Sequence, residues 1–298
     1  MDILELKHVQ KRFGSLSVLE DVSFRVPEHT LFGFVGQNGA GKTTTMKMIL
    51  GLLQMDGGAV TVNGEPVRYG QTAANRFVGY LPDVPEFYSF MTPDEYLRFC
   101  GEISGMPARA IAPRAGELLT LVGLAGEKRR IRGFSRGMKQ RLGIAQALLN
   151  RPRLLICDEP TSALDPIGRK EILDILVNAK EQTTVVFSTH ILSDVERICD
   201  EIAFLHHGKI VLQGTLEEVK QHHHSAGFEV ELEYPRDAQR LLAAFPDAKQ
   251  LTRSHLLFTQ DEQAEAVMRL LLDSHIPIRR MEKREPTLES LFMEVAGQ

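Results

Sequence analysis

Residues 36–43 read GQNGAGKT, and this stretch decides the fold. It fits the pattern GxxxxGK[ST], with the apolar run Leu31–Val35 before it and a helix predicted over residues 43–52 after it. Glycines let backbone N–H groups converge on phosphate oxygens, and the first turn of a helix adds a positive partial charge. The stretch therefore predicts a phosphate-binding loop between a buried strand and a helix. The alternative is an ordinary glycine-rich turn, which the order strand, loop, helix disfavours.

The side chains of this stretch carry the predicted chemistry. Lys42 is expected to reach the β- and γ-phosphates of a nucleotide, and Thr43 to place its hydroxyl on Mg²⁺. A nucleotide, which the resemblance given below implies to be ATP, and Mg²⁺ are thus the predicted cofactors. The residues of this stretch predicted to bind the nucleotide are Gly36, Asn38, Gly39, Ala40, Gly41, Lys42, Thr43 and Thr44.

A pair of acids follows a second apolar run. Residues 154–160 read LLICDEP, so Asp158 and Glu159 come directly after four apolar residues. Asp158 is expected to hold Mg²⁺ through water, and Glu159 to polarise the attacking water as the general base. The alternative is two solvated acids at a strand end. The phosphate loop in the same chain favours the catalytic interpretation.

Several apolar runs have the pattern of strands that are covered on both faces, because they do not alternate with polar residues. Helical patterns separate them, which predicts an α/β fold with a mostly parallel sheet. Residues 93–150 show helical periodicity without a strand pattern, so we expect a helical subdomain over about 84–152. The predicted strands are Leu31–Val35, Phe77–Leu81, Leu154–Cys157 and Thr184–Phe187.

Residues 228–298 have a pattern of their own. Phe228–Glu233 alternates strictly between apolar and acidic residues, as a strand with one buried face does. The later residues complete the order β-α-β-β-α-β with an added closing helix, which is typical of a small α+β split-βαβ unit. We therefore divide the chain into a nucleotide-binding domain (1–220), a polar linker (221–227) and an accessory domain (228–298).

The composition excludes several classes of protein. Hydrophobic residues make up 43% and charged residues 25%, which are ordinary globular values. The net charge of −4 gives no overall attraction to nucleic acid. Cys100, Cys157 and Cys199 are widely spaced and form no CxxC pair, so we expect a reduced, cytoplasmic protein without disulfides or a zinc motif. No apolar run approaches the roughly 18–20 residues of a membrane span, and we expect no signal peptide in residues 1–13.

Further motifs surround the acid pair in a set order. Residues 134–141 read FSRGMKQR, residues 162–165 read SALD, and residues 187–190 read FSTH. Together with the phosphate loop, this set resembles the nucleotide-binding subunit of ATP-binding-cassette (ABC) transporters over residues 1–220. FSRGMKQR, GYLPD at residues 79–83 and the C-terminal extension are most similar to the ABC-2-type exporter branch. The resemblance implies the P-loop NTPase core of an ABC ATPase, with an antiparallel β part near the N-terminus.

The resemblance also implies roles for single residues. Phe13 lies where an aromatic ring stacks on adenine, the alternative being a core phenylalanine. Ser135 and Gly137 would contact the γ-phosphate of ATP held by a second subunit, from the start of a helix. Asp165 would link two such sites across the interface, and His190 would be catalytic by sensing the γ-phosphate and orienting water. Ser135 and Asp165 also fit ordinary helix N-caps, and both interpretations stay open.

Three positions depart from the family pattern. Gln37 replaces the proline or glutamate of many relatives, at a side chain that need not touch phosphate. Arg136 replaces a small residue, and we expect it to point outward. Asp83 stands where many relatives place a glutamine that binds Mg²⁺. An ionised aspartate cannot donate a hydrogen bond, although it can meet Mg²⁺ directly or through water, so its role as a metal ligand stays open.

Two clusters carry weaker signals. Residues 128–132 read KRRIR, which fits either a solvated loop or electrostatic support for the nucleotide. Aromatic residues do not interleave with it, so we predict no nucleic-acid partner. Residues 222–224 read HHH, but neighbouring side chains diverge and no cysteine or acid lies beside them, which disfavours a metal site.

The predicted function is that of an ATP-binding and ATP-hydrolysing subunit of an ABC transporter. We expect a homodimer, or a pair with a related subunit, with ATP at a head-to-tail interface. The membrane permease is expected to be a separate chain, which would hold this subunit on the cytoplasmic face of the cell membrane. The alternatives are a soluble ABC ATPase outside transport, a small-molecule P-loop kinase and a non-hydrolysing regulator.

Overall fold

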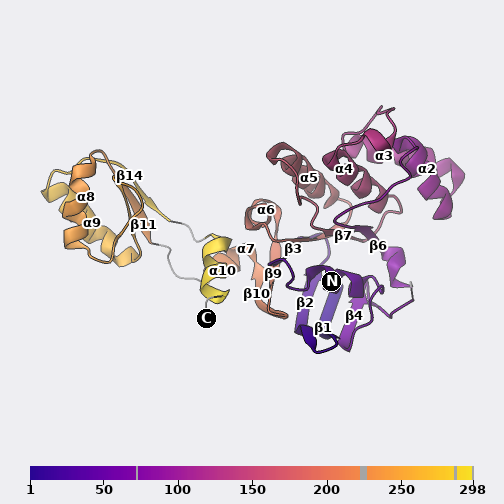
Figure 1. The fold of residues 1–298 in the computed structure, drawn as a ribbon, viewed down its shortest axis with the longest axis horizontal. Coiled ribbons are helices and arrows are strands. Elements are labelled where there is room, and N and C mark those ends of the chain that lie inside the picture. The colour runs from indigo at the N-terminus through magenta and orange to yellow at the C-terminus, as the bar shows by residue number, and fades with distance from the viewer. Residues whose placement is uncertain (72, 222–226, 285–286, 297–298) are drawn as a thin grey trace. The chain divides into compact units, whose positions relative to one another are not determined.

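The computed structural model describes residues 1–71, 73–221, 227–284 and 287–296. The chain divides into two compact units, Met1–Leu216 and Glu217–Gln298, and each has its own sheet and hydrophobic core (Figure 1). Most of the predicted linker, residues 221–227, lies outside the described residues. In the part of the chain that the structure describes, no helix is long and apolar enough to cross a membrane.

The first unit contains one ten-stranded sheet with the order β5-β4-β1-β2-β10-β9-β3-β8-β7-β6. Its antiparallel part comes from the N-terminal quarter of the chain, where the side chains of long strands alternate between buried and exposed. This part consists of β1 (Asp2–Phe13), β2 (Leu16–Pro27), β4 (Gly57–Val62) and β5 (Glu65–Pro66).

The other part of this sheet is mostly parallel. Every residue of β3, β7 and β8 is buried, as expected for apolar strands covered on both faces. Parallel strands end at a common edge, so the residues that follow β3, β7 and β8 are brought together there. The strands are β3 (Leu31–Gly36), β6 (Val78–Leu81), β7 (Leu154–Asp158), β8 (Thr184–Thr189) and β9 (Glu201–His206), with β10 (Lys209–Thr215) antiparallel to β9.

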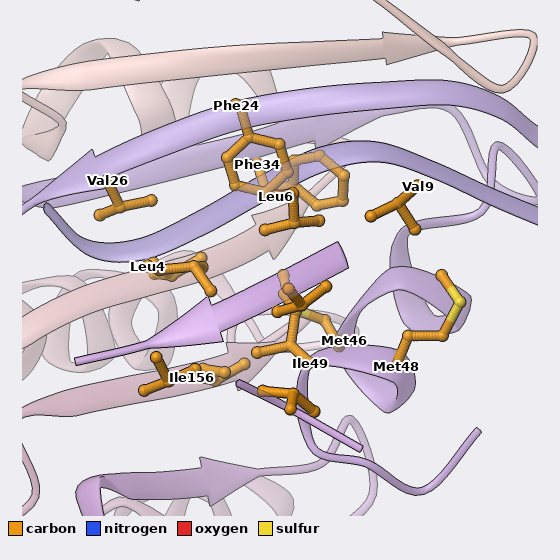
Figure 2. Close-up of a cluster of buried hydrophobic side chains, with 14 of the residues drawn as sticks. Leu4, Leu6, Val9, Phe24, Val26, Phe34, Met46, Met48, Ile49 and Ile156 are labelled. Carbon is orange, nitrogen blue, oxygen red and sulfur yellow. The ribbon is translucent and has the colours of Figure 1, made fainter. Parts of the chain in front are cut away.

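The main core holds the phosphate loop in place. Helix α1 (Lys42–Ile49) packs on β3, β4 and β7, and its Met46, Met48 and Ile49 join apolar side chains from both parts of the sheet (Figure 2). Phe24 of β2 stacks on Phe34 of β3, with ring centroids 5.2 Å apart. Each fully buried side chain of this size contributes about 1.5–3 kcal/mol, so the two ends of the loop are firmly anchored.

Helix α1 ends three residues earlier than the predicted range, 43–52. Gly51 has a φ of 67°, its N–H bonds to the Met48 carbonyl oxygen, and the Leu52 N–H bonds to the Lys47 carbonyl oxygen. This is the hydrogen-bond pattern of a Schellman C-cap, which a left-handed glycine makes possible.

Three helices between β6 and β7 form the helical subdomain. They are α2 (Pro93–Ile103), α3 (Ala108–Leu121) and α4 (Arg136–Ala147), and α4 packs on β6 (Figure 1). Thr92 caps α2 by accepting from the Glu95 N–H, while the Glu95 side chain accepts from the Thr92 N–H. Two further helices, α5 (Pro166–Ala179) and α6 (Leu192–Ile198), flank β8 in the sequence.

The second unit contains a four-stranded antiparallel sheet with the order β12-β13-β11-β14. Helices α8 and α9 cover one face of it, where Val230, Leu256 and Phe258 are fully buried (Figure 1). The predicted split-βαβ unit is thus confirmed, with its central strands β11 and β13 side by side. Helix α7 (Leu216–Gln221) precedes the split-βαβ unit in the sequence. The elements of the unit are β11 (Phe228–Leu232), α8 (Ala238–Ala244), β12 (Lys249–Gln250), β13 (His255–Phe258), α9 (Ala264–Asp273), β14 (Ile278–Lys283) and α10 (Leu288–Ala296).

Candidate nucleotide-binding site

The loop between β3 and α1 has a backbone that only glycine allows at several positions. Gly39 and Gly41 have φ angles of 83° and 109°. A Cβ atom on Gly41 would come within 2.7 Å of the Leu19 side chain, and one on Gly36 within 2.7 Å of the Leu205 carbonyl oxygen. The loop is therefore held against β2 and β9, which leaves its N–H groups in place for an anion.

Lys42, the first residue of α1, is drawn into this loop. Its side chain is 5% exposed, and its Nζ donates to the backbone oxygens of Gly36 and Gln37 at 2.7 and 3.1 Å. The same Nζ lies 3.1 Å from Oε1 of Glu159. The ammonium is thus almost surrounded by oxygens, which is the environment that phosphate oxygens would also supply.

The acid pair lies at the end of β7, beside β8. Ser188 of β8 donates its hydroxyl to Oδ1 of Asp158 at 2.5 Å, and Asp158 is buried. The Glu159 N–H donates in turn to the Ser188 hydroxyl at 3.1 Å. Ser188 thereby holds both acids on one strand edge. Ser188 lies in the FSTH motif, but the sequence suggested no role for it, because its contacts depend on the pairing of β7 with β8.

Glu159 and His190, the two predicted catalytic residues, contact each other. Nδ1 of His190 lies 2.9 Å from Oε2 of Glu159, while Lys42 approaches the other carboxylate oxygen. The Glu159 side chain is 13% exposed, and that of His190 is 39% exposed. The carboxylate is therefore positioned by two cationic or hydrogen-bonding groups, and an imidazole beside it can hold or relay a proton.

A cavity of about 390 Å³ brings these groups together. Residues of the phosphate loop, Glu159, His190 and Asp83 line it, and so does Ser162 of the SALD motif, for which the sequence suggested no role. Asp158 does not line it. The lining residues are Asn38, Gly39, Gly41, Lys42, Thr43, Thr44, Asp83, Glu159, Ser162 and His190.

A second cavity, of about 410 Å³, shares Asn38 and Gly39 with the first. It also contacts Ala40 and residues 16–18, just past the tip of the β1–β2 hairpin, together with residues 206–208. Phe13 lies at that tip and is 49% exposed, with Lys11 Nζ 5.2 Å from its ring centroid. The core alternative for Phe13 is therefore wrong, whereas its contact with adenine stays a prediction.

Ser135, Gly137 and Asp165 do not line the first cavity. Ser135 caps α4 by accepting from the Met138 N–H at 3.2 Å, and Asp165 caps α5 by accepting from the Gly168 N–H at 3.0 Å. Pro166 is the first residue of α5. The N-cap interpretations of both residues are confirmed, and their roles toward a second subunit stay predictions.

Comparisons with known proteins identify the family. A model of the ABC transporter family matches residues 19–162, and a model of the C-terminal domain of DrrA1-3-like ATP-binding proteins matches residues 214–296. The ABC transporter ATP-binding protein YxlF of Bacillus subtilis is 44% identical over 220 residues, which are 74% of this chain and 73% of that protein.

The chain belongs to the ABC transporter ATP-binding proteins.

A further relative and a solved structure are also similar to this ABC protein. The bacitracin transport ATP-binding protein BcrA of Bacillus licheniformis is 33% identical over 99% of this chain and 87% of its own length. A solved ATP-binding subunit of an ABC transporter superposes with a TM-score of 0.65 at 35% identity, over 74% of this chain and 92% of that one. The predicted family, its branch with the C-terminal extension and the ABC ATPase fold are confirmed.

Asp83 of this ABC protein lies at the edge of the nucleotide cavity, but its side chain already has a partner. Arg136 Nη2 donates to Asp83 Oδ1 at 3.2 Å, and the Gln140 side chain donates to the Asp83 carbonyl oxygen at 2.7 Å. Arg136, which we expected to point outward, is 43% exposed and faces the loop after β6. The two largest departures from the family pattern thus contact each other.

Burial raises the pKa of two side chains near the acid pair of this ABC ATPase, Tyr80 and Cys157. Burial raises the pKa of Tyr80 to about 12, and the carboxylates of Asp158 and Asp83 add to the effect. Burial likewise raises the pKa of the Cys157 thiol, which sits under the acid pair. Both groups stay neutral at physiological pH, so the charge of the site comes from its carboxylates and from Lys42.

The residues present fit a magnesium ion. Thr43 and Asp83, which line the cavity, and the buried Asp158 at the end of β7 all carry hard oxygen donors. Among the described residues, no three His, Cys, Asp or Glu side chains gather closely enough to hold a metal by themselves. Mg²⁺ in nucleotide sites uses one or two protein oxygens together with phosphates and water, so this donor set suffices.

The basic cluster at residues 128–132 lies outside the lining of the first cavity. The charged residues of 128–132 are exposed and absent from the cavity lining, and Arg129 pairs with Glu127 at 2.6 Å. This fits the solvated-loop interpretation. The His222–His224 run lies outside the described residues.

Proposed function

We propose that this protein hydrolyses ATP to energise a separate membrane permease, as the ATPase subunit of an ABC-2-type exporter. The observation that carries the proposal is the convergence of Lys42, Glu159 and His190 on one cavity beside a phosphate loop. A phosphate-binding lysine, a general base and an imidazole that orients it are the groups that ATP hydrolysis needs.

The proposed role of Glu159 follows from its two contacts. ATP would offer its phosphate oxygens to Lys42, which would release Oε1 of Glu159 to accept a proton from water. His190 would keep the other oxygen, Oε2, in place and so orient the carboxylate. A positioned base of this kind contributes about 10²- to 10⁴-fold to the rate.

Mg²⁺ would be held by Thr43 and Asp158, with Asp83 as a further ligand, and would supply charge neutralisation at the phosphates. Ser188 supports this role because its hydrogen bond orients the Asp158 carboxylate from the side of β8. The remaining loop residues, from Gly36 to Thr44, would bind the nucleotide through backbone N–H groups.

The proposed active form is a head-to-tail dimer, of two copies or of this chain with a related subunit. Ser135 and Gly137 lie at the start of α4, where the helix dipole favours an anion. A Cβ atom on Gly137 would meet only Leu164, at 3.8 Å, so this helix start is open to a close approach. Asp165 would act at the same interface. These residues lie outside the nucleotide cavity of their own subunit. They would therefore contact a nucleotide that is bound by the other subunit.

An apolar patch supports the proposed membrane partner. Val84, Tyr88 and Phe90, in the loop between β6 and α2, are 63%, 51% and 59% exposed. Exposed aromatic and aliphatic side chains close together mark surfaces for partner binding. A permease bound there would place the subunit at the cytoplasmic face of the membrane. The name of BcrA assigns that relative to bacitracin transport, which supports an exporter here.

The composite site can be tested by mixing two inactive variants. Lys42→Ala removes the phosphate contact of one subunit, and Ser135→Arg blocks the opposite face. If each site is built from both subunits, a mixed dimer keeps one intact site of two, so each mixed dimer should have up to about half of the ATPase activity of a wild-type dimer. Neither variant alone should be active.

The same preparations separate the alternatives. Activity that no mixture restores would contradict the shared site. Phosphate transfer to a small-molecule acceptor, with no phosphate released into water, would favour the kinase alternative. Copurification of the wild-type protein with ribosomes or DNA, rather than with a membrane protein, would favour a soluble ABC ATPase outside transport.

A further inference from the structure

The loop after β6 is joined to α4 by two hydrogen bonds of different kinds. The amide of Gln140 donates to the Asp83 carbonyl oxygen at 2.7 Å, and Gln140 is fully buried. The guanidinium of Arg136 donates to the Asp83 carboxylate at 3.2 Å, and both side chains of this pair are more than two-fifths exposed. The main chain at Asp83 is therefore held from the interior, while its carboxylate takes part in a contact that water can reach.

The same carboxylate borders the nucleotide cavity. Asp83 lines it together with Lys42 and Thr43, the residues proposed to bind the phosphates and Mg²⁺. Carboxylate oxygens are preferred ligands of Mg²⁺. One side chain is thus placed between two cations, the guanidinium of Arg136 and the metal that would accompany the nucleotide.

The position of Arg136 explains why the carboxylate stays there without nucleotide. Arg136 is the first residue of α4, where the helix dipole disfavours a cation and favours a nearby anion. Asp83 compensates for this charge. Ion pairs as exposed as this one are weak, so a divalent metal can displace the arginine.

We infer that the Asp83–Arg136 ion pair is a latch that competes with the magnesium–nucleotide complex for the Asp83 carboxylate. Arg136 is a positioning residue, which sets the magnesium dependence of nucleotide binding. Gln140 keeps the main chain in place, so the exchange needs only the Asp83 side chain to rotate. The inference rests on the proposed function to the extent that the cavity takes a nucleotide with Mg²⁺.

The test measures binding of a non-hydrolysable ATP analogue, AMP-PNP, to the full chain by titration calorimetry. Binding is followed at increasing Mg²⁺ concentration and also in EDTA. Arg136→Ala frees Asp83, so half-maximal enhancement of binding should require about two- to five-fold less Mg²⁺. A residue with only a structural role would shift this value in the opposite direction or not at all.

Two controls separate the latch from the general effect of charge. Arg132→Ala removes an exposed arginine whose backbone N–H bonds to Ser89, and it should leave the magnesium requirement unchanged. Arg136→Lys keeps a cation near Asp83 and should stay close to the wild type. In an Asp83→Asn background, Arg136→Ala should no longer change the magnesium requirement, because the shared carboxylate is gone.

The outcomes distinguish this inference from the proposed function. A magnesium requirement that Arg136→Ala raises or leaves unchanged overturns the latch, and so does an equal shift in the Asp83→Asn background. Failure of the wild-type protein to bind AMP-PNP under any condition would instead overturn the proposed nucleotide site.

Discussion

Glu159 is the proposed general base of this ABC ATPase, and its backbone conformation is unusual. Its φ angle of 48° is uncommon for a residue other than glycine. The hydrogen bonds from its N–H to the backbone and side-chain oxygens of Ser188 hold this conformation. Strained backbone is concentrated at functional sites because the surrounding structure maintains a side chain where it is needed.

Replacing Glu159 with Gln is expected to separate binding from turnover. The amide keeps the shape and a hydrogen bond to His190, but it cannot accept a proton from water. Steady-state ATP hydrolysis should fall by about 10²- to 10⁴-fold, while the Kd for ATP stays within about three-fold. The variant should also accumulate as a nucleotide-bound dimer, which size-exclusion chromatography with light scattering detects.

Glu181→Gln serves as the control, because this exposed acid lies just after α5 and outside the cavity. It should hydrolyse ATP at the wild-type rate. Single-turnover hydrolysis by Glu159→Gln close to the wild-type rate would remove Glu159 as the general base. A variant that stays monomeric at saturating ATP would argue against the dimer.

At the scale of elements, the contact between β6 and α4 decides how the helical subdomain meets the sheet. Gly79 of β6 lies so close to α4 that a Cβ atom would come within 2.1 Å of the Ala147 carbonyl oxygen. No flexible side chain can yield there, since the obstacle is backbone. The strand therefore carries glycine because a neighbouring helix passes directly over it.

Gly79→Ala is expected to destabilise the first unit by at least about 1–3 kcal/mol, since overpacking forces the strand and the helix apart. Urea denaturation followed by circular dichroism measures the change. Gly116→Ala is the matched control, because Gly116 is an exposed glycine in α3 with no atom within 4 Å of an added Cβ. Gly116→Ala should raise the free energy of unfolding of the first unit by about 0.5–1 kcal/mol. Equal effects of the two substitutions would contradict the close packing.

At the scale of the molecule, each of the two units has a hydrophobic core of its own. The core of the first unit centres on β1, β2, β3 and α1, and that of the second on β11, β13 and α9. Phe228 and Phe258 stack in the second core with ring centroids 4.8 Å apart. Separate cores favour separate unfolding transitions, because cooperativity requires shared packing.

Phe258→Ala tests this separation. Removal of this fully buried aromatic side chain should lower the free energy of unfolding of the second unit by about 3–5 kcal/mol. The stability of the first unit should not change. Differential scanning calorimetry should show that transition at lower temperature, and the Kd for ATP should stay at the wild-type value. Phe187→Ala, in the buried strand β8, should instead lower the temperature at which the first unit unfolds, which is the transition that ATP shifts to higher temperature. One joint transition, shifted by either substitution, would contradict separate units.

The sequence by itself determined the fold class and most of the site. GQNGAGKT needs a strand before it and a helix after it, and LLICD must lie in the same sheet for its acids to reach the phosphate loop, so local patterns sufficed. The buried strands β3, β7 and β8 lie within two residues of their predicted ranges, because unbroken apolar runs have few other ways to be covered.

Only the tertiary structure decided which groups touch. Ser188 holds Asp158, Lys42 approaches Glu159, and Asp83 pairs with Arg136, 53 residues away. The close approach of α4 to Gly79 was likewise beyond prediction. Periodicity and motifs report how a segment folds and which chemistry it carries. Side-chain partners depend on the packing of strands and helices that are distant in sequence, and no local pattern records that packing.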